Sequence, residues 1–300
     1  MRDIYGGIAR RLRERVPFVV ATLVAARGAK ASAIGTSLVV DADGSFAGDI
    51  GAGCHEGELV ERATAMLAAK ASVAQRLSFD IDDEVMPGTG CGASLDVVVW
   101  RPQPEFEEVA RAIASGEHDV RFALEGAAIE IPGKVRLVIV GATALAAELA
   151  RFARECDYAV TIVDPRPAFA TRARQPAADE LIVAWPDDVA AATRLDEAAA
   201  VAILSHDVKL DLPALRAALG SPARYIGLLG NRRVQAARRA ALREEGYDDA
   251  QLARIHGPAG LDIGGTTDGQ TAVSILAEMI AMQRDRAAEP LSQSAGPIHP

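Results

Sequence analysis

The pattern of apolar residues changes partway along the chain, and this change predicts two domains. Up to Arg101 the apolar residues form short β-branched runs interrupted by glycines, as expected of strands. An amphipathic stretch over residues 56–70 predicts a helix among them. The predicted strands cover residues 18–24, 36–40 and 95–100. We therefore expect an N-terminal α+β domain over residues 1–101.

From Val135 onward, nearly continuous apolar strands alternate with segments of helical spacing. This order is typical of a parallel sheet with helices on its faces, so we expect a Rossmann-like, doubly wound parallel sheet over residues 134–286. Thr267 and Gln270 match a capping box at the start of the last helix. The predicted strands are 135–140, 159–163, 180–183, 199–204 and 224–227; the predicted helices are 145–156, a segment running through Leu215, and a last one whose apolar positions are Ala272, Ile275, Leu276, Met279 and Ile280.

Two further stretches lie outside these domains. Residues 102–133 are interpreted as a linker that carries a polar helix running towards Gly116 and a short hairpin. After Arg286 the content of Pro, Ser and Gly predicts a disordered tail over residues 287–300.

Composition narrows the class of protein. Half of the 300 residues are hydrophobic and the formal net charge is −9. This balance argues against a nucleic-acid partner, because nucleic-acid binding depends on clustered Lys and Arg. The apolar runs are too short to span a bilayer, and no stretch of signal-peptide type follows Met1. We expect a cytoplasmic protein with reduced thiols and without a membrane partner.

Glycines flank two of the three cysteines. Cys54 lies in the sequence GAGCHE at residues 51–56, and Cys91 lies in PGTGCG at residues 87–92. Glycine lets backbone N–H groups approach an anion and lets a thiol face a ligand. Cys54 also directly precedes the predicted helix, whose dipole would lower the thiolate pKa. The lone Cys156 is interpreted as a small buried hydrophobe.

A zinc site built from these cysteines is a weaker alternative. Cys54, His55 and Cys91 are the candidate ligands, but no CxxC pair is present and adjacent residues seldom chelate one metal well. We therefore predict no metal site.

The second domain carries only part of a dinucleotide fingerprint. Gly141 follows the first strand, and Asp164 lies about 20 residues further on, where a ribose-binding acid is expected. Thr143, however, occupies the position at which a second glycine would let the backbone approach a pyrophosphate. The sequence leaves open whether NAD(P) binds or whether the sheet keeps only the topology.

Two later strand ends carry candidate functional groups. His206 lies in Ser205-His206-Asp207 and is a candidate acid or base, the alternative being that Asp207 or Asp211 merely caps the next helix. Gly227, Gly230 and Arg232 belong to a strand–turn–helix whose N-terminus and arginines could bind a phosphate or carboxylate.

Taken together, these motifs resemble the xanthine dehydrogenase accessory family, the XdhC/CoxI family, over nearly the whole chain. The carrying segments are residues 51–56, 90–92, 205–211, 225–233 and 256–264. The chain departs from the family pattern in having Ala52, Ala93 and Thr143-Ala144. The resemblance implies a chaperone that binds the molybdenum cofactor, protects it while a sulfido ligand is installed, and inserts it into xanthine dehydrogenase or a related molybdenum hydroxylase.

The resemblance also implies roles for individual residues and partners. Cys54 and Cys91 would hold the cofactor or relay sulfur, with Glu56 or His55 setting protonation. A cysteine desulfurase is a further implied partner, and a homodimer is expected. The competing hypothesis is an NAD(P)-dependent oxidoreductase that uses His206 as acid or base. The cofactor-binding residues predicted for the two hypotheses are Gly51, Gly53, Cys54, Gly90, Cys91, Gly92, Gly141, Asp164, Gly227, Gly230 and Arg232.

Overall fold

The chain forms two compact units: the first comprises Met1–Gly133 together with Leu291–Pro300, and the second comprises Lys134–Pro290. The computed structural model describes residues 1–27, 34–50, 55–80, 94–188, 193 and 195–293. Each unit has its own hydrophobic clusters, two in the first and two in the second. The two units are therefore described separately.

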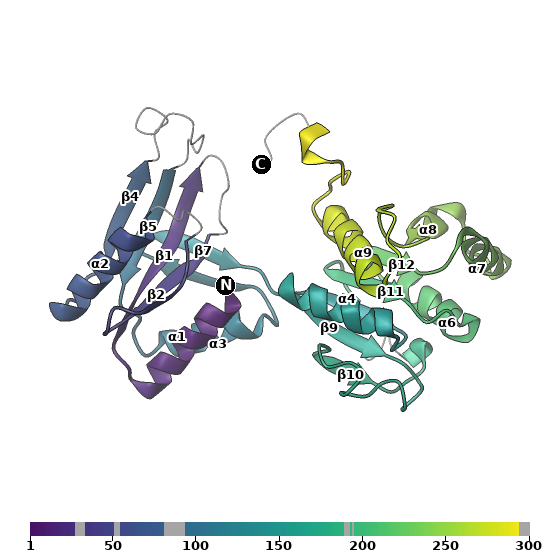
Figure 1. Ribbon diagram of the computed structural model, residues 1–300, viewed down its shortest axis with the longest axis horizontal. Helices are drawn as coiled ribbons and strands as arrows, with labels where there is room; N and C mark the ends of the chain where they lie inside the picture. The colour runs from purple at the N-terminus through teal and green to yellow at the C-terminus, as the bar shows by residue number, and fades with distance from the viewer. Residues whose placement is uncertain (28–33, 51–54, 81–93, 189–192, 194, 294–300) are drawn as a thin grey trace. The chain divides into compact units, whose positions relative to one another are not determined.

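The first unit is an antiparallel sheet with helices on both faces (Figure 1). Helices α1 (Arg2–Glu14) and α3 (Phe106–Ser115) cover one face, and α2 (Glu56–Ala68) covers the other. The strand order is β3-β2-β1-β5-β4, with bounds β1 (Phe18–Arg27), β2 (Ser37–Asp41), β3 (Phe46–Gly48), β4 (Gln75–Asp80) and β5 (Ser94–Trp100).

Strand alternation explains why this sheet has a core on each face. Val20 and Val24 of the central strand β1 pack against α1 and α3, whereas Val19, Ala21 and Leu23 pack on the side of α2. Successive side chains of a strand point to opposite faces, so a strand that is buried on both faces is apolar throughout. The predicted strands and the predicted helix after Cys54 are all present, whereas the edge strands β3 and β4 were not predicted.

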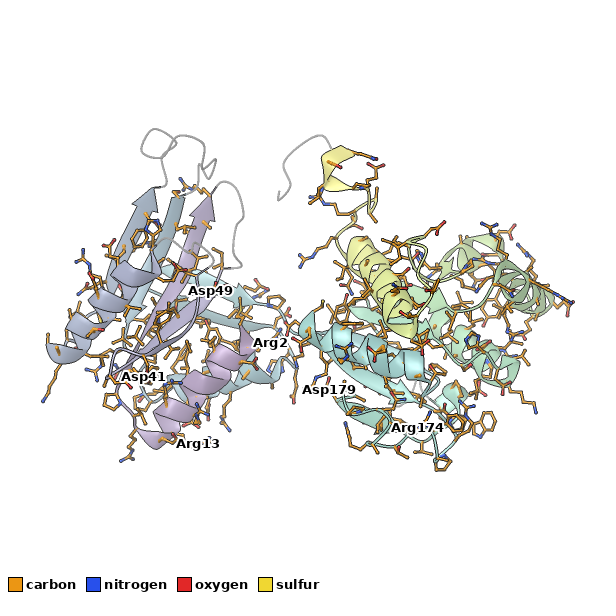
Figure 2. The ribbon with its side chains drawn as sticks, viewed as in Figure 1. Arg2, Arg13, Asp41, Asp49, Arg174 and Asp179 are labelled. Carbon is orange, nitrogen blue, oxygen red and sulfur yellow. The ribbon has the colours of Figure 1, made fainter. Side chains whose placement is uncertain are left out.

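Residues 102–133 were expected to be a linker, but they belong to the first unit. Helix α3 and the hairpin of β6 (Val120–Leu124) and β7 (Ala127–Ile131) supply Ile113, Ile129 and other buried residues to the core that α1 shares. Arg2 lies at the start of α1, where Figure 2 labels it. Its guanidinium donates to the carbonyls of Ile113 and Pro132, at 2.7 and 2.6 Å. The segment thus belongs to the first unit, because its apolar face is buried there.

The second unit is a six-stranded parallel sheet in the order β10-β9-β8-β11-β12-β13. This confirms the predicted Rossmann-like, doubly wound topology. The strand order reverses between β8 and β11, and ligands of such folds bind at the carboxyl ends of the strands near that reversal. The strands are β8 (Val135–Val140), β9 (Tyr158–Val163), β10 (Glu180–Ile182), β11 (Ala199–Ile203), β12 (Tyr225–Leu228) and β13 (Ile255–His256).

Helices cover both faces of this sheet (Figure 1). Helices α4 (Ala144–Glu155) and α9 (Asp268–Gln283) pack together on one face, where Leu149 and Ile275 are fully buried. Helices α6 (Val208–Leu219), α7 (Arg232–Glu244) and α8 (Asp249–Ala253) supply the core of the other face.

Cys156 ends α4 as its C-cap and is exposed, so the interpretation of it as a buried hydrophobe was wrong. Of the predicted tail, Leu291–Gln293 form a 3-10 turn, and residues 294–300 lie outside the described part. Among the described residues, no helix combines the length and the apolar character that crossing a membrane requires.

Candidate functional site

The described residues that flank the two cysteine-bearing segments lie at one end of the first unit's sheet. Gly51, Gly53 and Cys54, and likewise Gly90, Cys91 and Gly92, lie outside the described residues. The described residues that flank them are close together. Asp80, which precedes the second segment, pairs in register with Ser94, which follows it. His55, which follows the first segment, stacks on Phe79 with ring centroids 4.3 Å apart.

His55 and Glu56 begin helix α2 directly after Cys54. His55 is the N-cap, and Glu56 lies in the first helical turn, where carboxylates interact favourably with the helix dipole. The Nε2 atom of His55 is buried and has no hydrogen-bond partner among the described residues. Buried polar atoms are normally satisfied, so this nitrogen marks a place where a further group can bind.

Gly141 follows β8 at the reversal of strand order. Its φ is +102°, and a Cβ built on it would lie 2.7 Å from Cα of Ser205. The backbone after β11 therefore occupies the space beside this glycine. Gly141 is needed for close packing of two loops, a different requirement from approach to a pyrophosphate.

The other two fingerprint residues, Thr143 and Asp164, form hydrogen bonds within the protein. Thr143 is the N-cap of α4, and its hydroxyl accepts a hydrogen bond from the Ala146 N–H at 3.1 Å. The fully buried Asp164 accepts from the Ala142 N–H at 2.8 Å and forms an ion pair with Arg166 at 2.6 Å. A ribose hydroxyl or a pyrophosphate would have to displace these partners.

Asp164 is held as a carboxylate. Burial opposes its ionisation, but hydrogen bonds from the Arg166 side chain and from the backbone N–H groups of Ala142 and Arg166 outweigh this, so the pKa of Asp164 is lowered. Asp164, the acid expected to bind a ribose, therefore stabilises its own loop by binding the Ala142 N–H and Arg166.

His206 stands at the carboxyl end of β11 with a left-handed backbone, at φ 57°. Asp207 is the N-cap of α6 and accepts from the Lys209 N–H at 2.9 Å, which confirms the capping alternative for that residue. Asp211 is 1% exposed; it accepts from the Ser205 hydroxyl at 2.5 Å and pairs with Arg238 at 3.1 Å. These contacts hold the loop that presents His206 to solvent.

The last predicted motif, residues 227–232, has mixed roles. A Cβ on Gly227 would lie 2.6 Å from the Tyr225 ring, and one on Gly230 would lie 2.9 Å from Val234, so both glycines serve close packing. Arg232 is different, because it lies at the first position of α7 and lines a pocket.

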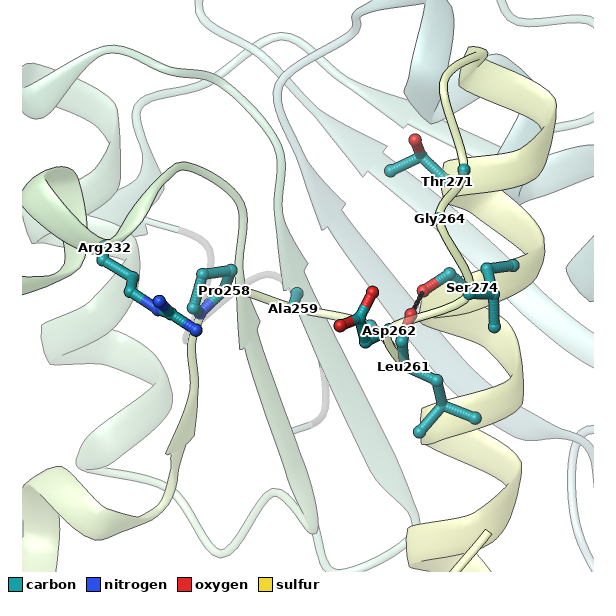
Figure 3. A pocket seen from close by; sticks show the side chains of 11 residues that line it. Arg232, Pro258, Ala259, Leu261, Asp262, Gly264, Thr271 and Ser274 are labelled. Carbon is teal, nitrogen blue, oxygen red and sulfur yellow. Dashed lines mark hydrogen bonds between the residues drawn. The ribbon is translucent and has the colours of Figure 1, made fainter. Parts of the chain in front are cut away.

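This pocket has a volume of about 380 Å³ and is formed by two sequence motifs (Figure 3). Arg232 comes from the motif after β12, and residues 258–265 come from the loop after β13. Asp262 belongs to this loop, and Thr271 and Ser274 of helix α9 line the pocket as well. This loop is among the motifs that carry the family resemblance, but the sequence does not show what its residues do, since Asp262 and Arg232 come to line one pocket only through the fold.

The architecture defines the class of protein: an antiparallel α/β domain followed by a Rossmann domain. The chain belongs to the XdhC and CoxI family, which matches residues 11–80, and the XdhC Rossmann domain matches residues 137–279. The predicted family is therefore confirmed. Cys54 and Glu56 lie inside the first matched range, and Cys91 lies beyond it.

Relatives of known name agree with this membership. The chain is 25% identical over 291 residues to the molybdenum cofactor insertion chaperone PaoD of Escherichia coli (strain K12), a match that covers 88% of this chain and 83% of PaoD. It is 29% identical over 154 residues to a probable xanthine dehydrogenase subunit of Bacillus subtilis (strain 168), covering 51% of this chain and 44% of that protein.

A solved structure shows the same fold. A crystal structure described as a xanthine dehydrogenase from Bacillus halodurans has a TM-score of 0.76, covering 97% of this chain and 98% of that chain at 21% identity. At this identity the likeness concerns the fold alone.

Proposed function

We propose that this protein is a molybdenum cofactor chaperone, which carries the cofactor and inserts it into a molybdenum enzyme. The observation that carries the proposal is that the described residues flanking both cysteine segments lie close together, with His55 stacked on Phe79 and Asp80 paired with Ser94. The likeness to PaoD over most of both chains supports it.

In this proposal the cofactor is cargo, and the chain's own residues bind and shield it. Cys54 and Cys91 would hold the cofactor or relay its sulfur through their thiolates. The start of α2 at Glu56 supports the expectation that the helix dipole stabilises a thiolate at Cys54. His55 would position the cargo through its buried Nε2 atom, because that nitrogen has no other partner among the described residues.

The second unit gives less support to the oxidoreductase hypothesis. Thr143 and Asp164 already have hydrogen-bond or ion-pair partners inside the protein. NAD(P) binding would require these contacts to be replaced, whereas a chaperone does not need them to open.

Finer parts of the proposal concern the partners. The cargo would be a sulfurated cofactor, its acceptor xanthine dehydrogenase or a related hydroxylase, and its sulfur donor a cysteine desulfurase. A homodimer is a further part of the proposal, because folds of this kind commonly associate with closed symmetry. Co-purification of the tagged protein with each partner, and its mass in solution, test these points.

The decisive experiment is retention of freshly released molybdenum cofactor by the purified protein during anaerobic gel filtration. The protein fraction is assayed for molybdenum and for the fluorescence of the oxidised pterin. We expect stoichiometric retention by the natural sequence and by Cys156→Ser, whose thiol is exposed in the second unit. Cys54→Ser and Cys91→Ser should each lose it. Failure of the natural sequence to retain pterin, or unchanged retention in both variants, would contradict the proposal.

A further inference from the structure

Two side chains of opposite charge face one pocket of the second unit without pairing with each other. Arg232, at the start of α7, lies at one end, and Asp262, from the loop after β13, lies towards the other (Figure 3). Within the described part of the chain, neither side chain has a hydrogen bond or ion pair. Arg233, the next residue of α7, likewise has no hydrogen bond or ion pair within the described residues, whereas the arginines further along the helix have partners: Arg238 binds Asp211, Arg239 binds the carbonyls of Leu252 and Ile255, and Arg243 binds Asp249.

The loop that carries Asp262 is fastened on both sides of the pocket. The Ser274 hydroxyl donates to the Leu261 carbonyl at 2.5 Å, and the Gly260 N–H donates to Glu278 at 2.9 Å. On the other side, the Ala259 N–H donates to the Leu228 carbonyl at 3.0 Å. A pocket with fixed walls binds a ligand at a lower cost in ordering than a mobile loop does.

The anchor Glu278 is held ionised. Burial opposes its ionisation, but hydrogen bonds from His256, Tyr225 and the Gly260 N–H outweigh burial and lower its pKa. The Tyr225 hydroxyl lies 2.6 Å from Glu278, and the Tyr225 ring stacks on His256 with centroids 5.0 Å apart. The pocket loop is therefore connected through Glu278 to helix α9 and, through the bond between Glu278 and Tyr225, to strand β12.

The volume of the pocket and the apolar part of its lining suit a flat ring of modest size. The pocket of about 380 Å³ lies in the range of about 300–1,000 Å³ that is usual for small-molecule sites. Pro258, Leu261 and Ile263 line it, and the Ile263 side chain is 52% exposed although it is aliphatic. An exposed aliphatic group at the edge of a pocket can cover the face of a bound ring and so be removed from water.

The separated charges define the ends of such a ligand. A guanidinium suits phosphate, to which it donates two parallel hydrogen bonds. A carboxylate has only acceptors, so it suits a ring edge that carries two adjacent N–H donors. A 2-amino-4-oxopyrimidine ring, which pterins and guanine share, presents such an edge, whereas adenine and cytosine place a donor beside an acceptor.

We infer that this pocket binds a phosphorylated pterin, with Arg232 on the phosphate and Asp262 on the 2-amino-4-oxopyrimidine edge. The choice of a pterin over a guanine nucleotide rests on the proposed function, since the cargo is a phosphorylated pterin. The inference adds to that function a binding site in the Rossmann domain, separate from the cysteine segments.

Equilibrium titration of the full-length protein tests the site, with neopterin monophosphate as the probe and pterin fluorescence as the signal. Unphosphorylated neopterin, GMP and AMP are the comparison ligands. Saturable binding of neopterin monophosphate, tighter than that of neopterin and of AMP, is expected. Binding of GMP without binding of neopterin monophosphate overturns the pterin assignment, and binding of AMP as tight as that of the pterin overturns the role of Asp262.

Matched variants test whether Arg232 binds the phosphate and Asp262 binds the ring edge of the ligand. Arg232→Gln should weaken neopterin monophosphate at least about tenfold and leave neopterin nearly unchanged, whereas Asp262→Asn should weaken both ligands to a similar degree. Arg243→Gln and Asp249→Asn, which remove an exposed ion pair in the same unit, are controls that should bind as the natural sequence does. Unchanged binding in both pocket variants overturns the inference.

The cofactor-retention experiment separates this inference from the proposed function. If neopterin monophosphate binds as expected while molybdenum cofactor is not retained, the proposed function fails and the pocket remains a pterin site. If the cofactor is retained equally by Arg232→Gln and Asp262→Asn, and neopterin monophosphate does not bind, the pocket inference fails and the proposed function stands.

Discussion

Gly141 lies where two loops come closest, at the carboxyl ends of β8 and β11. Its left-handed φ of +102° and the nearness of Ser205 are separate reasons for glycine at this position. The first glycine of a dinucleotide fingerprint is explained by the tight turn after the strand, and the left-handed φ of Gly141 fits that role. The nearness of Ser205 adds a second requirement for glycine at this position.

Gly141→Ala should therefore destabilise the protein for two reasons. The left-handed backbone costs about 1–2 kcal/mol for a residue with a Cβ, and overlap with Ser205 adds about 1–3 kcal/mol. Gly246→Ala is the matched control, because Gly246 has φ +97° and nothing within 4 Å of the added Cβ. Urea unfolding monitored by circular dichroism should show the larger loss for Gly141→Ala. Equal losses would contradict the crowding.

Asp164 gives a prediction about acid stability. Its pKa is lowered in the folded protein, whereas in the unfolded chain an aspartate titrates near about 3.9. The stabilisation is therefore complete above about pH 5 and is lost as the pH falls through the lower folded-state pKa. The free energy of unfolding, measured between pH 3 and 6, should fall less steeply for Asp164→Asn. Arg166→Gln, which removes the partner, should also flatten the profile, and an unchanged slope in both variants would refute this explanation.

At the scale of elements, helix α9 links the core of the second unit to its pocket. Ala272, Ile275 and Met279 are fully buried, and Ser274 on the same helix binds the pocket loop. The predicted periodicity identified the buried face, although Ile280 remains 37% exposed. The predicted capping box is present, with Thr267 accepting from the Gln270 N–H and Gln270 accepting from the Thr267 N–H.

Thr267→Ala should remove one half of this capping box and cost about 1 kcal/mol, because a helical N–H loses its acceptor. Thr267→Ser keeps a hydroxyl at the same position and should lie within a few tenths of a kcal/mol of the natural sequence. Thermal unfolding of the three proteins compares them. A loss of similar size in Thr267→Ser would show that the methyl group matters and that the cap does not.

At the scale of the whole molecule, the hydrophobic clusters of the described residues each lie on one side of the boundary after Gly133. Among the described residues, the clusters of the first unit draw only on residues before 134, and those of the second only on residues after it. Of the fifteen buried residues in the cluster beneath α1, six follow Arg101. The first unit therefore needs the segment that the sequence had suggested was a linker.

A truncation experiment follows from this arrangement. A fragment of residues 1–133 should fold with a cooperative thermal transition, because its two cores are complete. A fragment of residues 1–101 should not, since it lacks α3, the β6–β7 hairpin and their share of the core. Circular dichroism and dispersed NMR amide signals measure the outcome. A cooperative transition in the shorter fragment would restore the linker interpretation.

Much of the fold was predictable because periodicity records burial. The central strands are apolar throughout since they are covered on both faces, and α9 carries its apolar residues at helical spacing. The edge strands β3 and β4 were missed because their solvent-facing side chains interrupt the apolar pattern. The hairpin after α3 was recognised, but its membership of the core was not, since sequence alone does not show which surface its apolar residues cover.

The sequence by itself determined the two-domain organisation, the doubly wound topology and the family, because these depend on local patterns and ordered motifs. Only the tertiary structure decided the partners of the candidate groups. Asp164 meets Arg166, Gly141 meets Ser205, and Arg232 comes to share a pocket with Asp262, thirty residues away in sequence. Whether a polar side chain is satisfied within the protein or left to a ligand depends on contacts between distant segments, and only packing in three dimensions establishes them.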